Sequence, residues 1–283
     1  MSTPRAAALE KLLTVVDSLR EPDGCPWDRK QTVTTMAKYV LEEGYELVEA
    51  IEQGDDLATQ EELGDLLMVL AMICRIASEG ERFDIEQAAE TVAEKLVRRH
   101  PHVFGDQDAA EDAEAALASW ESVKSAEREA KGVDASALAG LPLGLPALAR
   151  AARTCEKAIG SGFRWDTAAG AFAKVEEELG ELRAALAPVD LDAVKVRPVG
   201  ADKDHVEAEL GDLLMASAFF ARYLGLDPEA CLREALRRFE SRFREMESSL
   251  DGPIAEHDLP ALMAAWEAAK TATGAAPARN LTD

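Results

Sequence analysis

The chain has 283 residues, enough for one large domain or two ordinary ones, and 47% of them are hydrophobic, which suffices for a core. It carries 31 Lys and Arg against 54 Asp and Glu, a net charge of −23, and this argues against a protein that binds bare nucleic acid through its phosphates. No apolar run approaches the ~20 residues of a membrane-spanning helix. The four scattered cysteines form no CxxC pair. We therefore expect a cytoplasmic protein with no membrane segment.

Helical periodicity begins near the N-terminus and continues along the chain. Apolar residues at 9, 12, 13, 16 and 19 recur every three or four positions, the period of one helical face, and a turn-forming segment at 20–24 ends that stretch. Period-two alternation, the mark of a strand, is nearly missing from the sequence. The pattern predicts an all-α fold.

Short motifs occur twice, in the same order, in the two halves of the chain. The pairs are GCPWD and GFRWD (from 24 and 162), LEEGYEL and EEELGEL (from 41 and 176), EELGDLLM and AELGDLLM (from 61 and 208), KLVRR and RFESR (from 95 and 238), and SWESVK and AWEAAK (from 119 and 265). Such internal self-similarity predicts repeated structural units. We expect two tandem helical bundle domains at 1–127 and 145–272, a linker at 128–144 and a disordered tail at 273–283.

Acidic residues three positions apart occur on two consecutive predicted helices of each half, so each pair lies on one helical face. The pairs are Glu43 and Glu46, Glu62 and Asp65, Glu178 and Glu181, and Glu209 and Asp212. Apolar residues before and after them turn that face inward, where unpaired carboxylates are costly. Solvated surface acids are the ordinary alternative, but the doubled pattern favours a site for a divalent cation with oxygen ligands, such as Mg²⁺. A di-iron site would need Glu-x-x-His, which this chain lacks.

Basic and aromatic residues complete the repeated pattern. Lys95 with Arg99, and Arg238 with Arg242, are cations four residues apart that can meet phosphates or serve as ordinary surface charge. Trp120 and Trp266 can stack on a base or anchor helix packing. The sequence leaves these alternatives open.

Four segments together resemble the MazG family of nucleoside triphosphate pyrophosphohydrolases: GCPWDRKQT at 24–32, YVLEEGYELVEAI at 39–51, EELGDLL at 61–67 and KLVRRHPHVFGD at 95–106. The resemblance implies one all-α bundle per domain and assembly as a homodimer. It also implies hydrolysis of a broad range of nucleoside triphosphates to monophosphate and pyrophosphate, a housecleaning role in nucleotide pools. The implied cofactor is Mg²⁺, with Mn²⁺ as a substitute.

The resemblance also implies roles for individual residues. The eight acids above become metal ligands, and the implied nucleotide contacts are Lys174, Arg238, Arg242, Trp266 and Lys270 in the second domain, with Lys95, Arg99, Trp120 and Lys124 in the first. Glu177 or the ligand Glu178 would accept the proton of the attacking water. We expect the second domain to be the more active, because it has Lys174 where the first has Tyr39.

Two alternatives remain at this stage. A non-catalytic module that senses nucleotide or metal would keep the same pocket without turnover. The second half is also longer between its acidic segments, at 187–204, and we expect this connection, with Lys195, Arg197, Lys203 and His205, either to fold over the triphosphate or to be a plain loop.

Overall fold

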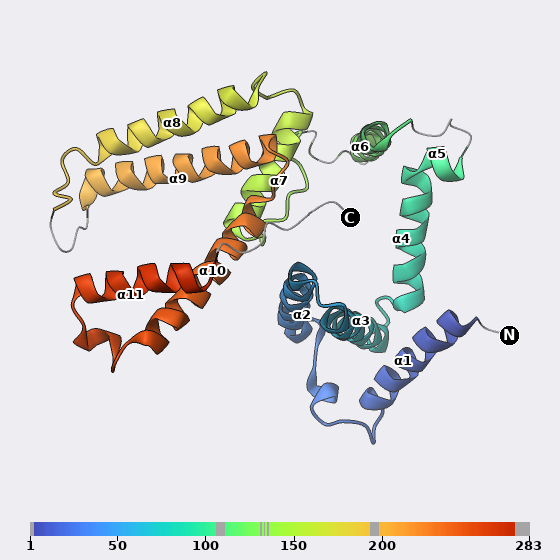
Figure 1. Cartoon of the computed structure of the whole chain (residues 1–283). Coiled ribbons are helices and arrows are strands. Elements are labelled where there is room, and N and C mark those ends of the chain that lie inside the picture. Colours follow the sequence, from blue (N-terminus) through green and yellow to red (C-terminus); the bar gives the residue numbers. More distant parts are fainter. Residues whose placement is uncertain are drawn as a thin grey trace. The chain divides into compact units, whose positions relative to one another are not determined.

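The computed structural model of the chain describes residues 3–105, 111–130, 132, 134, 136–192 and 198–274. Over these ranges the protein consists of helices and turns without a β-strand, which confirms the all-α prediction (Figure 1). It divides into two compact units, Met1–Lys131 and Gly132–Asp283. The domain limits expected at 127 and 145 stay a prediction, and the expected tail lies outside the described residues from 275 onward. No helix in the described ranges is long and apolar enough to cross a membrane.

The described helices of the first unit are α1 (Pro4–Arg20), the 3-10 helix η1 (Asp28–Lys30), α2 (Val33–Gln53), α3 (Asp56–Glu79), α4 (Ile85–Arg99), α5 (Pro101–Phe104) and α6 (Ala113–Ala130). Those of the second are α7 (Ala147–Gly160), α8 (Ala168–Ala185), α9 (Gly200–Tyr223), α10 (Pro228–Ser249), the 3-10 helix η2 (Ile254–Glu256) and α11 (Leu259–Ala272). In each unit, two long helices pack along one another, α2 on α3 and α8 on α9.

Local capping explains why α2 and α3 form an antiparallel pair. The Thr32 side chain accepts a hydrogen bond from the Thr35 amide, and the Thr35 hydroxyl oxygen accepts one from the Thr32 amide, so a capping box starts α2. Gly54 ends α2 at φ +70°, a left-handed conformation that glycine adopts without strain. Asp55 then caps α3 by accepting from two backbone amides. The chain therefore reverses between the two acidic segments within a tight turn.

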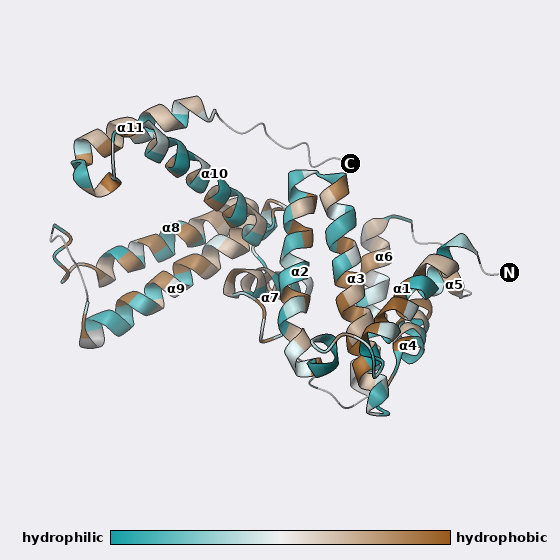
Figure 2. Ribbon diagram, turned by 90° about the horizontal axis from the view of Figure 1, so that it is seen from below, coloured by the Kyte–Doolittle hydropathy of each residue, from teal (hydrophilic) through white to brown (hydrophobic). Residues whose placement is uncertain are grey.

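The core of the first unit lies where α1 crosses the α2–α3 pair. Val16 from α1, Met36 from α2, and Val69 and Met72 from α3 are almost fully buried there. In Figure 2 the brown of apolar residues and the teal of polar ones alternate along the long helices. The buried side of α3 lies toward its C-terminal half, so its N-terminal half, with Glu62 and Asp65, is left to the acidic site.

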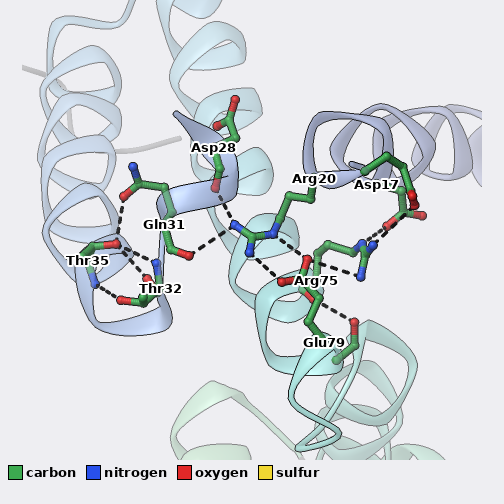
Figure 3. A network of polar contacts seen from close by, with 10 residues as sticks. Asp17, Arg20, Asp28, Gln31, Thr32, Thr35, Arg75 and Glu79 are labelled. Carbon is green, nitrogen blue, oxygen red and sulfur yellow. Dashed lines mark hydrogen bonds and ion pairs between the residues drawn. The ribbon is translucent and has the colours of Figure 1, made fainter. Parts of the chain in front are cut away.

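A buried arginine ties three elements of the first unit together (Figure 3). The Arg20 guanidinium, whose side chain is 6% exposed, donates to both carboxylate oxygens of Glu79 on α3 at 2.6 Å. It also donates to the backbone carbonyls of Asp28 and Gln31, in the segment that leads into α2. Arg75 adds ion pairs to Asp17 and Glu79 beside it. The loop before α2 is therefore held against both α1 and α3.

The second unit uses aromatic packing at the corresponding place. Trp165, in the turn before α8, packs edge-on against Phe219 of α9, with ring centroids 5.1 Å apart. Tyr223 of α9 donates its hydroxyl to the Trp165 carbonyl at 2.8 Å. Helices α10 and α11 form a hairpin that diverges from the α8–α9 pair (Figures 1 and 2). In both units a side chain therefore donates to backbone carbonyls just before the first acidic helix. The donor is a guanidinium in the first unit and a phenol hydroxyl in the second.

The long connection between α8 and α9 differs from its sequence-based description. Helix α9 already begins at Gly200, so Lys203 and His205 are helical rather than part of a loop. The repeat shows only that this half is longer between its acidic segments, which does not fix the residue at which the next helix begins. Lys195 and Arg197 lie outside the described residues.

All four cysteines are free thiols. Cys74 of α3 and Cys155 of α7 are buried, one in each unit. Burial raises the pKa of the Cys155 thiol to about 11 and also raises the pKa of Cys74. Both buried thiols therefore stay protonated near neutral pH.

Candidate functional site

The α2–α3 pair gathers carboxylates of the first unit at one place. Glu43 and Glu46 on α2 and Glu62 on α3 have carboxylate oxygens that all lie within 4.8 Å of one another. Asp65, one helical turn after Glu62, is close enough to act on the charges of both Glu43 and Glu62. Helical spacing places each pair on one face, and the tight turn after Gln53 brings the two faces together.

The electrostatics of this first cluster are those of carboxylates without a counterion. Partial burial raises the pKa of Glu43, and the nearby charges of Glu46, Asp65 and Glu62 raise it further. Partial burial and the charges of Glu46 and Asp65 likewise raise the pKa of Glu62. No described Lys, Arg or His forms an ion pair with these four acids. The carboxylates of this cluster therefore repel one another, and a bound cation would reduce that repulsion.

The α8–α9 pair builds the equivalent cluster in the second unit. Glu178 on α8, which is 6% exposed, lies with Glu209 and Asp212 on α9 so that their carboxylate oxygens fall within 4.8 Å. A hydrogen bond with Glu178 raises the pKa of Glu181, and burial and the charge of Glu178 act in the same direction. Three of the four expected acids of each unit thus lie within 4.8 Å of one another, with Asp65 and Glu181 interacting beside them.

Two basic side chains, Lys174 and His205, lie in contact with the second cluster. The Lys174 Nζ lies 2.7 Å from Glu178 Oε1 and 2.8 Å from Glu177 Oε1. These hydrogen bonds to Glu177 and Glu178 raise the pKa of Lys174. His205 Nε2 lies 3.3 Å from Glu209 Oε1. The sequence analysis assigned His205 to the connection rather than to the helix beside Glu209, although its spacing four residues before Glu209 was the available signal.

The residues present fit a hard divalent cation. Glu209 Oε2 is buried and accepts no hydrogen bond from any residue within the described ranges. A buried carboxylate oxygen without a donor is unfavourable unless something positive binds to it. Glutamate and aspartate oxygens are the ligands that Mg²⁺ and Mn²⁺ prefer. The two groups that can hold such an ion are therefore the acids of α2–α3 and those of α8–α9.

The basic and aromatic residues of the first unit gather between α4 and α6, away from these acids. Arg99 lies over the Trp120 ring at 5.3 Å from its centroid, and the Lys124 Nζ lies at 4.4 Å. The Arg99 guanidinium is already paired with Glu127 Oε2 at 2.7 Å. Hydrogen bonds from Arg99 and Arg98 lower the pKa of Glu127 to about 2. Three of the expected nucleotide contacts are thus assembled, and exposed Lys95 lies on the same helix α4.

The corresponding residues of the second unit lie on the α10–α11 hairpin. Arg238 pairs with Glu234 of its own helix at 3.3 Å, and Lys270 pairs with Glu267 at 2.9 Å. The Trp266 ring packs against Phe239 at 5.2 Å between centroids, and Arg242 is half-buried on α10. Within the described chain, Lys174 is the one expected nucleotide contact that pairs with a cluster acid. Within the described ranges, the other expected cations form no ion pair with the acids of their own unit.

The acidic helices carry apolar side chains that the described chain leaves exposed. On α2 and α3 they include Leu41, Tyr45, Leu63, Leu67 and Leu70, and on α8 and α9 they include Phe172, Leu179, Leu210 and Leu214. Large contiguous apolar surface on a folded protein marks an interaction surface.

Comparison with known proteins places the chain beside one family. The family model described as "MazG nucleotide pyrophosphohydrolase domain" matches residues 31–104, which include the first acidic cluster. The "Nucleoside triphosphate pyrophosphohydrolase/pyrophosphatase MazG" of Thermotoga maritima is 40% identical over 265 residues, 92% of this chain and 95% of the relative. The "Nucleoside triphosphate pyrophosphohydrolase" of Escherichia coli K12 is 40% identical over 240 residues, 84% of this chain and 87% of the relative.

Proposed function

This chain belongs to the MazG family, and from that premise we propose that it hydrolyses nucleoside triphosphates to the monophosphate and pyrophosphate. The printed names of its relatives support the reaction. Mg²⁺ as the cofactor, with Mn²⁺ able to replace it, and a broad range of bases and sugars are parts of the same proposal. The four free cysteines fit an enzyme of the reducing cytoplasm.

The observation that carries the proposal is the pairing of acidic faces, with buried Glu178 and the unpartnered Glu209 Oε2 at its centre. When bound, a divalent cation supplies charge neutralisation for phosphates and lowers the pKa of a water molecule. Glu178, Glu181, Glu209 and Asp212 would hold it in the second unit, and Glu43, Glu46, Glu62 and Asp65 in the first. Because the chain has a net charge of −23, a bound cation is needed to offset the repulsion between its acids and a triphosphate.

The reaction breaks one bond of the triphosphate. Water attacks the α-phosphorus, the bond from that phosphorus to the α–β bridging oxygen breaks, and pyrophosphate leaves with the bonding electrons. The proton of the water passes to a carboxylate, for which Glu177 and Glu178 are the candidates. Lys174, held 2.7 Å from Glu178, is placed to donate to a phosphate oxygen beside the cluster.

Assembly as a homodimer is the second part of the proposal. The described structure shows no ion pair between the acids of a unit and that unit's other expected nucleotide contacts. These are Arg238, Arg242 and Lys270 with Trp266 in the second unit, and Lys95, Arg99 and Lys124 with Trp120 in the first. A second copy that covers the apolar faces of α2–α3 and α8–α9 would bury those faces and bring its own basic side chains to the acids. Sedimentation of the full chain tests this part, and a monomer at micromolar concentration would contradict it.

Product analysis tests the reaction. The purified full chain is incubated with a panel of ribo- and deoxyribonucleoside triphosphates, with and without Mg²⁺ or Mn²⁺, and the products are separated by ion exchange. We expect monophosphate and pyrophosphate in equal amounts, and only when metal is present. Formation of diphosphate and inorganic phosphate instead would show that the enzyme cleaves a different bond from the one proposed. Binding of nucleotide without any product would favour a sensing module instead.

A further inference from the structure

The two acidic clusters differ at one helical position. Four residues before the first acid of each cluster, the second unit has Lys174 and the first has Tyr39. A residue at that spacing lies one turn away on the same helical face. The side chain there decides whether the cluster has a cation of its own.

In the second unit the ammonium of Lys174 lies within the acidic group. Its Nζ contacts Glu178 Oε1 at 2.7 Å, and Glu178 is the most buried acid of the cluster, with its side chain 8% exposed. The same Nζ contacts Glu177 Oε1 at 2.8 Å, whose side chain is 57% exposed. One oxygen of the central acid is therefore already neutralised by the protein, and Glu177 gives the ammonium a second support toward solvent.

In the first unit the equivalent position cannot supply a cation. The Tyr39 ring packs against the Trp27 ring, with centroids 6.0 Å apart. The Lys38 ammonium lies over the Tyr39 ring, 4.5 Å from its centroid. Tyr39 also borders the buried core formed by Val16, Met36 and Met72. The first cluster therefore presents its carboxylates to an incoming ion without an internal competitor.

We propose that Lys174 makes divalent-cation binding in the second unit depend on the nucleotide, whereas the first unit binds the free ion. Without nucleotide, an ion must displace the ammonium from Glu178 and leave it with Glu177 alone. A triphosphate offers the ammonium new anionic partners next to the cluster, so the oxygen of Glu178 becomes free when metal and nucleotide arrive together. This inference rests on the proposed function, since it concerns the same acids.

The expected size of the effect follows from the strength of the contact. Exposed ion pairs four residues apart on a helix contribute little, but contacts to a nearly buried carboxylate are stronger. We expect the free ion to bind the second site about tenfold more weakly than the first, a ratio that nucleotide should abolish.

Binding of Mn²⁺ to the full chain, followed by electron paramagnetic resonance, tests the inference without turnover. Glu43→Gln with Glu62→Gln leaves the second site alone, and Glu178→Gln with Glu209→Gln leaves the first. A variant with all four changes gives the background of this acidic chain. Each is titrated with Mn²⁺ with and without an α,β-methylene triphosphate analogue, which cannot be cleaved at the reacting bond.

Lys174→Met in the variant that retains the second site should tighten binding of free Mn²⁺ about tenfold and remove most of the dependence on the analogue. Lys203→Met is the matched control for binding of the free ion, because Lys203 pairs with Glu207 at 3.2 Å, outside the cluster, and the change removes the same charge. Equal binding of free Mn²⁺ at both sites, unchanged by Lys174→Met, would overturn the inference while leaving the metal sites intact. Binding no greater than background at either site, even with the analogue, would overturn the proposed function as well.

Discussion

Arg20 and Glu79, 59 residues apart in the chain, form a two-pronged ion pair whose nitrogen–oxygen distances are both 2.6 Å. The pair joins the last residue of α1 to the last residue of α3, and the same guanidinium holds two carbonyls of the loop before α2. Arginine suits this place because its planar fork can bind a carboxylate and backbone carbonyls at once. The angle at which α2 leaves the loop, and hence the position of Glu43, depends on this contact.

Replacing Arg20 by Met should lower the free energy of unfolding of the first unit by about 3 kcal/mol, because the change leaves Glu79 and two carbonyls without their donor. Urea unfolding followed by circular dichroism measures the change. Arg20→Lys should recover only part of it, since an ammonium cannot make the forked contact. Arg5→Met, an exposed change on the same helix, is the control and should leave the midpoint unchanged.

Glu127 should make the packing of α6 on α4 sensitive to acid. Its pKa is lowered from 4.5 to about 2 by Arg99 and Arg98, so its stabilising contribution is complete above pH 4.5 and is lost as the pH falls toward 2. Glu127→Gln should flatten the pH dependence of helix content over that window and lower stability at pH 7. Glu121→Gln, on the same helix, serves as the control, and an identical acid titration of both variants would contradict the assignment.

Neutralising a cluster acid should separate stability from function. The pKa of Glu62 is raised by burial and by its acidic neighbours, so its charged form is unfavourable in the metal-free protein at neutral pH. Glu62→Gln should therefore raise the thermal midpoint in chelator and reduce the further rise that Mg²⁺ produces in the parent. Calorimetry with and without Mg²⁺ makes the measurement. A lower midpoint in chelator would mean that repulsion is not stored there.

Turnover should depend mainly on the second cluster. Glu178→Ala with Asp212→Ala in the full chain should lower kcat at least about 100-fold, because it removes one ligand from each helix. The matched change in the first unit, Glu43→Ala with Asp65→Ala, should lower it less, since that unit has Tyr39 in place of Lys174. If the first-unit change is the more damaging, the order of activity of the two units is reversed.

Local signals made much of this structure predictable. The helical period of apolar residues gave the all-α fold, and the three-residue spacing of acids put Glu43 with Glu46, and Glu178 with Glu181, on shared faces. Gly54 and Asp55 mark the turn that places two such faces opposite each other. These features depend on neighbours within a few residues, which is why the sequence reveals them.

Long-range polar contacts were not predictable in the same way. Nothing in the periodicity of α1 connects Arg20 with Glu79, and the pairing of Arg99 with Glu127 depends on how α6 folds back on α4. The position of the α10–α11 hairpin is likewise set by packing rather than by local spacing, so the expected nucleotide contacts of Arg238 and Trp266 stay a prediction. Lys174 and Glu178 are the exception, because their contact lies within a single helical turn.

Each unit contains one buried thiol whose rate of chemical modification reports how often that unit opens. Cys74 in the first unit and Cys155 in the second cannot react with a disulfide reagent until the surrounding helices open, because the thiols are shielded and protonated. Exposed Cys231 should react within the first phase of modification and so provides a reference for the slower thiols. The slow phases of thiol modification, resolved by peptide mapping, therefore report how often each unit opens, separately and in the intact chain.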